Sequence, residues 1–129
     1  NRWCYYDYDQ EEIKDIPANH HLFITLRKAY TYDYMQYLNP EVADKADDLL
    51  LGIQACVWGE YIPDVPKLNV QTFPRSATVA EVTWTPDSVR NWNDFRLRLG
   101  KEFKRLEAAG ADFSKAYWQV IVNMNLESE

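Results

Sequence analysis

The chain has 129 residues and a net charge of −6, with 14 Lys and Arg against 20 Asp and Glu. This acidic balance without a basic cluster argues against nucleic-acid binding, and no apolar run approaches the ~20 residues of a membrane span. Aromatic residues make up 15% of the chain, which suits a core but also a sugar- or protein-binding surface, because Tyr and Trp join a flat apolar face to a polar edge.

Two segments have the pattern of strands. Residues 1–9 predict the end of a strand, and the near-continuous apolar run at 49–58 predicts a parallel strand buried on both faces. A polar loop is expected over 10–22, and the aromatic stretch at 23–39 has no clear period. Two strands do not make a closed sheet, so the pattern indicates part of a larger α/β fold.

Helices are expected in three places. The first begins at Asn39 as N-cap, with Pro40 in the first helical position. The second covers 73–84. The third ends at Gly110 in the C′ position, and its N-cap is expected among Thr85, Asp87 and Ser88. Its apolar face recurs at spacings of three and four: Trp92, Phe95, Leu99, Phe103 and Leu106. The tail at 116–129 alternates weakly, like a strand.

Two aromatic–carboxylate pairs stand at the ends of the predicted strands: Tyr5 with Asp7, and Trp58 with Glu60. Residues i and i+2 of a strand face the same side, so each pair is expected to point together. In a parallel α/β barrel, these strand ends carry the active site. An indole beside a carboxylate suits a sugar, which packs its C–H face on the ring and donates its hydroxyl groups to the carboxylate. The pattern alone also allows Trp58 in the core and Glu60 in solvent.

The other reactive residue types are expected to be structural. His20 and His21 lie in the predicted loop without a third ligand at useful spacing, so no metal site is expected. Cys4 and Cys56 are expected to face opposite ways as small buried thiols, not to form a disulfide. No phosphate loop or nucleophile motif is present, and no cofactor is expected.

Four blocks of sequence, in this order, closely resemble the family 20 glycoside hydrolases, the β-N-acetylhexosaminidases: CYYDYDQ, LLGIQACVWGEYI, FPRSATVAEVTWTP and WNDFRLRL. The resemblance covers roughly residues 4–110 and lies in the C-terminal part of the family's catalytic barrel. It implies a partial (β/α)₈ TIM barrel, about the last two βα units, with a C-terminal helical segment. Residues 1–113 would form the barrel portion and residues 114–129 a tail.

The resemblance also implies a role for each paired residue. Tyr5 matches the tyrosine that holds the carbonyl of the substrate's 2-acetamido group, and Asp7 a carboxylate near the outer hydroxyls, expected at O6. Trp58 matches an indole that lines the pocket, and Glu60 an acid on the O4 side. Gly59 departs from the family block, which often has Thr between the Trp and the Glu.

The family is a retaining one that uses substrate-assisted catalysis, in which an adjacent Asp-Glu pair orients the acetamido group and protonates the leaving oxygen. No Asp-Glu dipeptide occurs in these residues. The chain alone is therefore expected to be inactive, with its parent an exo-enzyme on glycans ending in β-linked GlcNAc or GalNAc. By resemblance only, the parent is expected to be secreted or periplasmic, although no signal segment opens this chain. Arg75 and Glu81 are expected to tie their helix to the barrel, and Trp84 to pack under its rim.

Two other classes of function stay open at this point. One is a non-catalytic carbohydrate-binding module on a partial barrel, with Tyr5, Trp58 and Glu60 as its sugar site. The other is a scaffold whose aromatic residues only form a core. A partial barrel has unpaired strand edges and apolar helix faces that the rest of the catalytic barrel, its expected partner, should cover. The chain alone is therefore expected either to self-associate or to fold differently from its segment in the complete enzyme.

Overall fold

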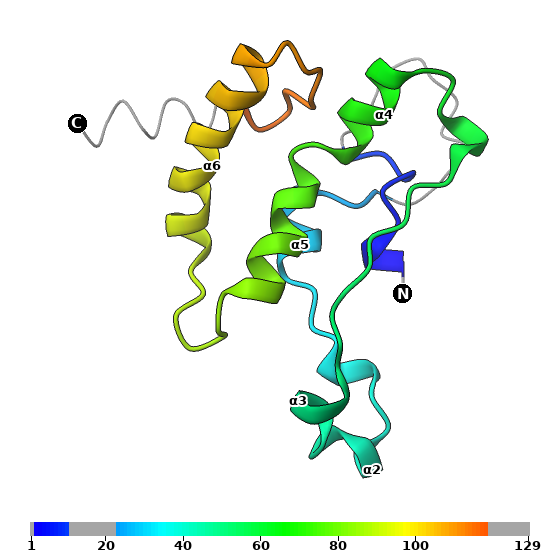
Figure 1. Cartoon of the computed structure of the whole chain (residues 1–129), viewed down its shortest axis with the longest axis vertical. Coiled ribbons are helices and arrows are strands. Elements are labelled where there is room, and N and C mark those ends of the chain that lie inside the picture. Colours follow the sequence, from blue (N-terminus) through cyan, green and yellow to red (C-terminus); the bar gives the residue numbers. More distant parts are fainter. Residues whose placement is uncertain (1, 11–22, 119–129) are drawn as a thin grey trace.

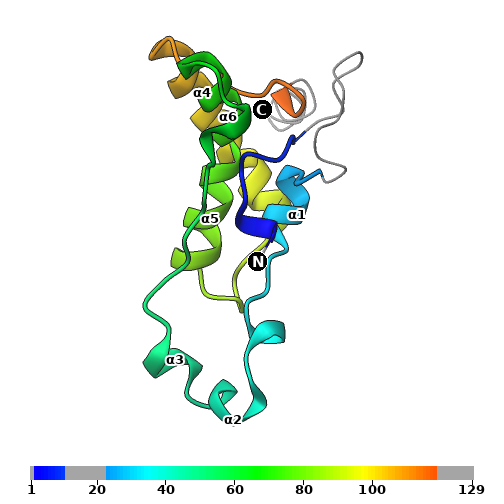
Figure 2. The ribbon, with the colours of Figure 1, turned by 90° about the vertical axis from the view of Figure 1, so that its right-hand side faces the viewer.

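A computed structural model describes residues 2–10 and 23–118 of the chain. Figures 1 and 2 show α4, α5 and α6 gathered at one end, while the segment with α2 and α3 extends away from them. No helix in these two ranges combines the length and apolar character needed to cross a membrane. The helical elements, in chain order, are η1 (Arg2–Cys4), α1 (Leu26–Tyr30), η2 (Met35–Tyr37), α2 (Pro40–Ala43), α3 (Ala46–Leu49), η3 (Gly59–Tyr61), α4 (Val65–Thr72), α5 (Arg75–Trp84) and α6 (Trp92–Ala108).

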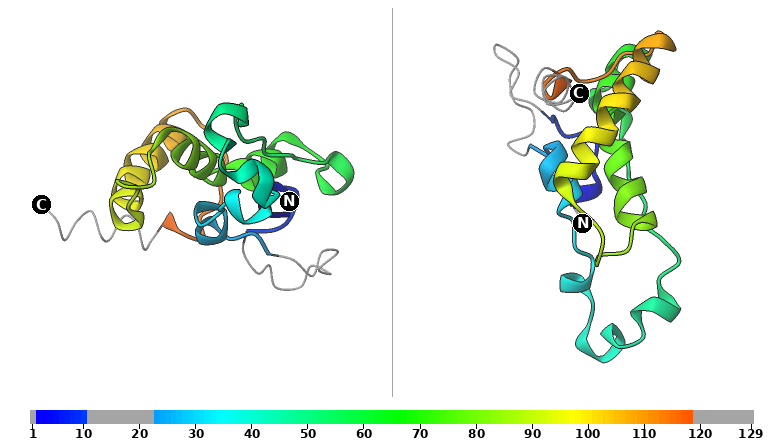
Figure 3. Two further views of the ribbon diagram at one scale, coloured as in Figure 1. Left: turned by 90° about the horizontal axis from the view of Figure 1, so that it is seen from below. Right: turned by 90° about the vertical axis from the view of Figure 1, so that its left-hand side faces the viewer.

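Helix α6 carries the largest core cluster. Both views of Figure 3 show it running alongside α5. Four of its predicted apolar positions are buried, and Trp92 at its start is partly buried with its ring centroid 4.9 Å from that of Tyr30. The amphipathic face expected for this helix is therefore confirmed. The buried members of the cluster are Leu26, Tyr30, Phe95, Leu99, Phe103, Leu106 and Phe113.

The N-terminus of α6 differs from the prediction. Its cap is Asn91, whose side-chain oxygen accepts from the backbone N–H groups of Asn93 at 2.8 Å and Asp94 at 3.1 Å. The expected caps at 85, 87 and 88 are wrong because the chain first closes a turn there, with the N–H of Arg90 donating to the carbonyl of Pro86 at 3.1 Å. The helix can begin only after that turn.

The C-terminus of α6 follows the prediction at Gly110. This residue has a φ of 67°, a conformation that glycine adopts without strain. Its N–H donates to the carbonyl of Glu107 at 3.0 Å, and the N–H of Ala111 donates to that of Leu106 at 3.0 Å. These two bonds form a Schellman motif, so the C′ role of Gly110 is confirmed.

Helix α5 begins directly after Pro74 and ends at Trp84, as expected for 73–84. Helix α4 before it was not predicted. Asp64 caps it by accepting from the N–H of Lys67 at 2.8 Å, and Pro66 lies in its first turn. An acidic cap followed closely by proline is a start signal, and the sequence contained it.

The helix expected to begin at Asn39 starts there but is not continuous. The Asn39 side chain accepts from the N–H of Glu41 at 2.9 Å, so the cap is confirmed, and Pro40 is the first helical residue. The chain leaves helical geometry at Lys45, where φ is −112° and ψ is 11°, and resumes as α3. Most of this segment is exposed, Val42 included, and among its described side chains only Ala46 is buried, so little packing supports a longer helix, which is marginal alone.

The predicted strands are reduced to one parallel bridge between Tyr5 and Cys56. Two backbone hydrogen bonds form it: the Cys56 N–H donates to the Cys4 carbonyl and the Tyr6 N–H to the Cys56 carbonyl, both at 2.7 Å. The described residues contain no strand longer than this bridge. The prediction of a strand at 49–58 buried on both faces is therefore wrong for this chain: Leu51 is fully exposed, because nothing described here pairs with or covers its outer side. Of the loop predicted at 10–22, all but Gln10 lies outside the described residues, His20 and His21 included, and so does the tail beyond 118.

Candidate active site

The Tyr5–Cys56 bridge sets the register of the candidate site. Residues paired in a bridge face the same side of a sheet, so Tyr5 and Cys56 share one face. Trp58 follows Cys56 by two residues and has extended φ and ψ of −87° and 133°. The structure therefore brings the Tyr5 segment and the Trp58 segment side by side.

Asp7 does not follow the strand alternation, because the backbone turns at Tyr6 and Asp7 directly after the bridge. Its side chain is buried, with 7% exposed, and its Oδ1 atom has no hydrogen-bond partner in the described structure. An unpaired buried carboxylate oxygen is costly, and it is a ready acceptor for a ligand hydroxyl or for a donor from elsewhere in the protein.

Trp58 and Glu60 are both exposed, Trp58 with 60% of its surface. Glu60 lies in η3, which has about three residues per turn, so the strand rule that predicted a common direction does not extend to it. Its charge raises the pKa of the neighbouring Tyr61 hydroxyl. A Cβ atom at Gly59 would meet nothing within 4 Å, so the glycine is not required by space.

Arg75 lies behind the Tyr5–Asp7 segment, with no exposed surface. Its guanidinium donates to four backbone carbonyl groups, those of Gln71 (3.0 Å), Tyr8 (2.8 Å), Ile24 (3.1 Å) and Tyr6. Burial lowers the pKa of Arg75 to about 10, so it stays charged at neutral pH. The expectation that Arg75 ties its helix to the rest of the fold is confirmed.

Tyr6 faces α5, on the opposite side from Tyr5. Its hydroxyl donates to the carbonyl of Arg75 at 2.8 Å and lies 3.3 Å from the hydroxyl of Thr78, while the Arg75 guanidinium stacks 4.7 Å from the ring centroid. Burial raises the pKa of Tyr6 to about 12. This buried contact fixes the distance between the bridge and α5.

Sequence reasoning missed the polar residues of α4 that hold the same segment. Gln71 is buried, and its Nε2 donates at 3.0 Å both to the carbonyl of Asp7 and to Oδ1 of Asp9. Lys67 forms an ion pair with the same Asp9 oxygen at 3.3 Å. Lys67 and Gln71 are four residues apart on one helix face, so recognition of α4 would have shown them as a pair.

The cysteines are free thiols, Cys4 buried and Cys56 half-buried, and burial raises the pKa of Cys4. Within residues 2–10 and 23–118, no group of three His, Cys, Asp or Glu side chains could hold a metal ion. The two segments that the bridge joins carry Tyr5 with Asp7 and Trp58 with Glu60, and aromatic and carboxylate side chains suit sugar recognition by stacking and hydrogen bonding.

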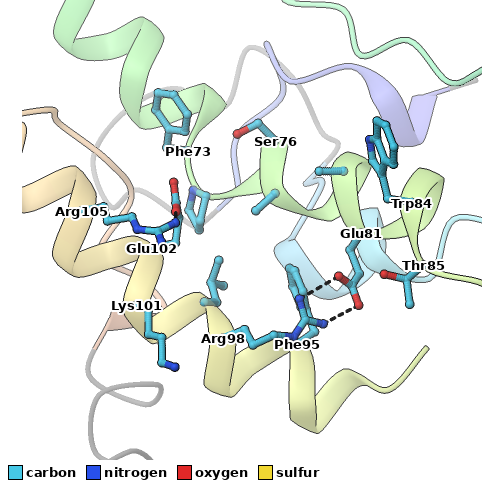
Figure 4. Close-up of a pocket in the computed structure, with 14 residues that line it drawn as sticks. Phe73, Ser76, Glu81, Trp84, Thr85, Phe95, Arg98, Lys101, Glu102 and Arg105 are labelled. Atoms are coloured by element: carbon cyan, nitrogen blue, oxygen red, sulfur yellow. Dashed lines mark hydrogen bonds and ion pairs between the residues drawn. The ribbon is translucent and has the colours of Figure 1, made fainter. Parts of the chain in front are cut away.

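A groove of about 750 Å³ lies between α5 and α6, apart from the predicted site residues (Figure 4). Glu81 is buried there and accepts two hydrogen bonds from Arg98, at 2.6 and 3.0 Å, which ties α5 to α6. Trp84 lines its edge with 87% of its surface exposed. The expectation that Trp84 is packed is wrong in this structure, because no described residue covers this end of α5.

The first 87 residues match the model of glycosyl hydrolase family 20, catalytic domain. A β-hexosaminidase of Porphyromonas gingivalis is 34% identical over 91 residues, which cover 70% of this chain and 11% of that protein. A β-N-acetylhexosaminidase of Cellulomonas fimi is 37% identical over 78 residues, covering 60% of this chain and 15% of that protein. The sequence resemblance to the family is thus confirmed.

Solved structures of the family also match the fold. The family 20 β-N-acetylhexosaminidase of Streptomyces coelicolor superposes with a TM-score of 0.71 at 29% identity, over 88% of this chain and 22% of that one. The Streptomyces plicatus enzyme in complex with Thio-NAglucal gives 0.70 at 31% identity, over 86% and 21%. These neighbours are TIM-barrel enzymes, and the chain spans less than a quarter of their length. With about two thirds of its residues matched by the family model, this chain belongs to glycosyl hydrolase family 20, within the catalytic domain.

Proposed function

We propose that this chain is part of a retaining exo-β-N-acetylhexosaminidase that removes terminal β-linked GlcNAc or GalNAc by substrate-assisted catalysis. The observation that carries the proposal is the family match over residues 1–87, which contains Tyr5, Asp7, Trp58 and Glu60 in the family's blocks. The bridge at Tyr5 supports it, because it joins the two segments that hold these residues.

The proposed place of the chain in the barrel is its last two βα units, within residues 1–113, with 114–129 as a tail. The order of elements supports this assignment. A segment at Tyr5 is followed by α1, then by a second segment that pairs with the first in parallel at Cys56, and then by α4 and α5. Parallel neighbours joined through a helix are the repeating unit of a βα barrel.

In the proposed reaction the substrate supplies its own nucleophile. The acetamido oxygen attacks the anomeric carbon as the bond to the leaving oxygen breaks, and Tyr5 holds that acetamido group by donating its hydroxyl proton in a hydrogen bond. The indole of Trp58 packs on the sugar ring, while Asp7 and Glu60 accept from its outer hydroxyls. The unpaired Oδ1 of Asp7 is suited to this, since it is buried and has acceptor capacity to spare.

The proton for the leaving group must come from outside these 129 residues, because they contain no Asp-Glu pair. We therefore propose that the chain positions substrate and is inactive alone. The test compares the complete enzyme with this chain on 4-nitrophenyl N-acetyl-β-glucosaminide and on the matching glucoside, which has no acetamido group. The complete enzyme should cleave only the first substrate, and Tyr5→Phe should lower kcat about 100-fold.

Two results would count against this function. Equal cleavage of the glucoside would exclude catalysis by the substrate's acetamido group. A complete protein that binds N-acetylglucosamine without cleaving either substrate would instead be a carbohydrate-binding module.

We also propose that the chain self-associates when separated from the rest of the barrel. Leu51, Trp58 and Trp84 are large apolar side chains with more than half of their surface exposed. Exposed apolar surface of this kind favours association. Sedimentation velocity across a concentration series should show species larger than 15.2 kDa, and a monomer at all concentrations would contradict the proposal.

A further inference from the structure

Three successive backbone carbonyl groups at the candidate site accept hydrogen bonds from helix side chains instead of from a strand. Arg75 donates to the carbonyls of Tyr6 and Tyr8, and Gln71 donates to that of Asp7 between them at 3.0 Å. On the other edge, the N–H of Tyr6 is bonded to the Cys56 carbonyl at 2.7 Å. The backbone around Asp7 is therefore held from both sides.

We call Arg75 and Gln71, which donate to these three carbonyl groups, the clamp, and its hydrogen bonds depend on the chemistry of these two side chains. A guanidinium has five donors in a planar fork, so one Arg75 side chain can bond several carbonyls and also stack on the ring of Tyr6. An ammonium group at this place would have three donors and no planar face. Arg75 has no exposed surface, and its hydrogen bonds to backbone carbonyl groups offset part of the cost of burying its charge.

The clamp and the sugar-facing residues share peptide groups. The amide N–H of Tyr6 belongs to the peptide group that begins at Tyr5, and the carbonyl that accepts from Gln71 belongs to Asp7 itself. Fixing these groups fixes the Cα–Cβ directions of Tyr5 and Asp7, since a backbone shift moves the side chain with it. Tyr6, Asp9 and, to a smaller extent, Asp7 also interact electrostatically with the buried guanidinium, which raises the pKa of Arg75 against the effect of burial.

We propose that Arg75 and Gln71 are positioning residues for the sugar site: Gln71 sets the place of Asp7, and Arg75 sets the backbone between Tyr5 and Tyr8. The inference rests on the proposed function for the roles of Tyr5 and Asp7. A displacement of about 1 Å in a positioned group can cost 100-fold in rate, so loss of the clamp should be visible in kinetics without loss of the fold.

The experiment uses the complete enzyme and 4-nitrophenyl N-acetyl-β-glucosaminide. Gln71→Met, of similar length without the donor, should raise KM about tenfold and change kcat by less than about threefold, because it acts through a binding group. In an Asp7→Asn background the same change should have little further effect, since its target is already impaired. Arg75→Lys should lower kcat as well, because it also releases the Tyr5 segment.

The control is Arg98→Lys, which disturbs the buried Glu81 ion pair on α5 but touches none of the clamp. It should lower Tm and leave KM and kcat unchanged. If near-UV circular dichroism shows that Arg75→Lys does not fold, the kinetics of Gln71→Met alone test the positioning role.

The outcomes separate the two proposals. If the wild-type enzyme does not cleave the substrate, or if Asp7→Asn leaves KM unchanged, the proposed function or site fails. If Asp7→Asn raises KM while folded Gln71→Met behaves as wild type, only the positioning role is overturned. Full additivity of Gln71→Met and Asp7→Asn would also overturn it.

Discussion

Trp58→Ala should cost less stability than the loss of a buried aromatic residue, and the size of the loss can be estimated from the exposed fraction of the side chain. The side chain is 60% exposed, so about 40% of its surface is buried. For a Trp of about 250 Å² that is about 100 Å², or about 2.5 kcal/mol at 25 cal/mol per Å². Compactness of the unfolded chain reduces the loss to about 2 kcal/mol. A fully buried aromatic residue would cost about 3–5 kcal/mol instead.

The same substitution should be severe for sugar binding. Stacking on a sugar ring would cover most of the exposed indole, and a central aromatic anchor of a binding site is worth at least about 2 kcal/mol. The dissociation constant of the complete enzyme for N-acetylglucosamine should therefore rise by about 30-fold or more. Isothermal titration calorimetry measures this affinity, and urea denaturation of the 129-residue chain measures the stability.

Trp84→Ala is the matched control, because Trp84 is 87% exposed and lies on α5 away from the bridge. It should lose less than about 1 kcal/mol and leave the sugar affinity unchanged. A loss above about 4 kcal/mol for Trp58→Ala would refute the reasoning, since it would make the indole a core residue. If Trp58→Ala left the affinity for N-acetylglucosamine unchanged, the proposed place of Trp58 in the sugar site would be refuted.

Three further substitutions test the fold. Phe103→Ala should lower the free energy of unfolding by about 3–5 kcal/mol in urea denaturation, because its side chain is fully buried and stacks on Phe113; a loss under 1 kcal/mol would contradict the packing of α6. Asn91→Ala should cost about 1 kcal/mol through its two cap bonds, and an unchanged Tm would argue against that cap. The phenol of Tyr6 keeps its proton up to a pKa of about 12 in the folded chain, above its ordinary value of 10, so its contribution is complete below pH 10 and is lost as the pH rises towards 12. The stability of wild type relative to Tyr6→Phe should therefore fall by about 1 kcal/mol between pH 9.5 and 11, and a constant difference would exclude the shift.

Local signals in the sequence predicted local structure well. Asn39 and Gly110 were assigned as caps from residue type and position, and both make the expected backbone bonds. Such motifs involve neighbours within a few residues, so the sequence window contains all their partners. The four sequence blocks identified the family for a similar reason, since each is a short continuous stretch and the four occur in the family's order. The prediction of the N-cap of α6 was wrong because several suitable residues precede that helix, and the turn closed between Pro86 and Arg90 determines which of them caps it.

The strand pairing and the hydrogen bonds of Arg75 and Gln71 depend on residues that are far apart in the sequence, so a short stretch of sequence does not contain both partners. The run at 49–58 has the composition of a buried strand, but among the described residues its only bridge is to Tyr5. Burial of a strand is set by what lies on its two faces, which composition does not reveal. The bonds of Arg75 to Tyr6 and Tyr8 span more than 60 residues and end on carbonyl groups, which every residue has. No residue type marks such an acceptor.

Substitutions on the two sides of the Tyr5–Cys56 bridge should have different effects. Towards α5, Tyr6 is buried in a cluster with Ile24 and Ala29 and lies against Arg75, so changes there act on folding. In contrast, Tyr5 is half-buried and Trp58 is mostly exposed, so changes there should cost the isolated chain less than changes in the core. Two aromatic side chains that contribute little to the core are consistent with the sugar-binding role that we propose for them in the complete barrel. The carbonyl of Asp7 accepts a hydrogen bond from Gln71, while Oδ1 of its buried carboxylate has no partner in the described structure, so its positioning and its proposed role in binding can be tested separately.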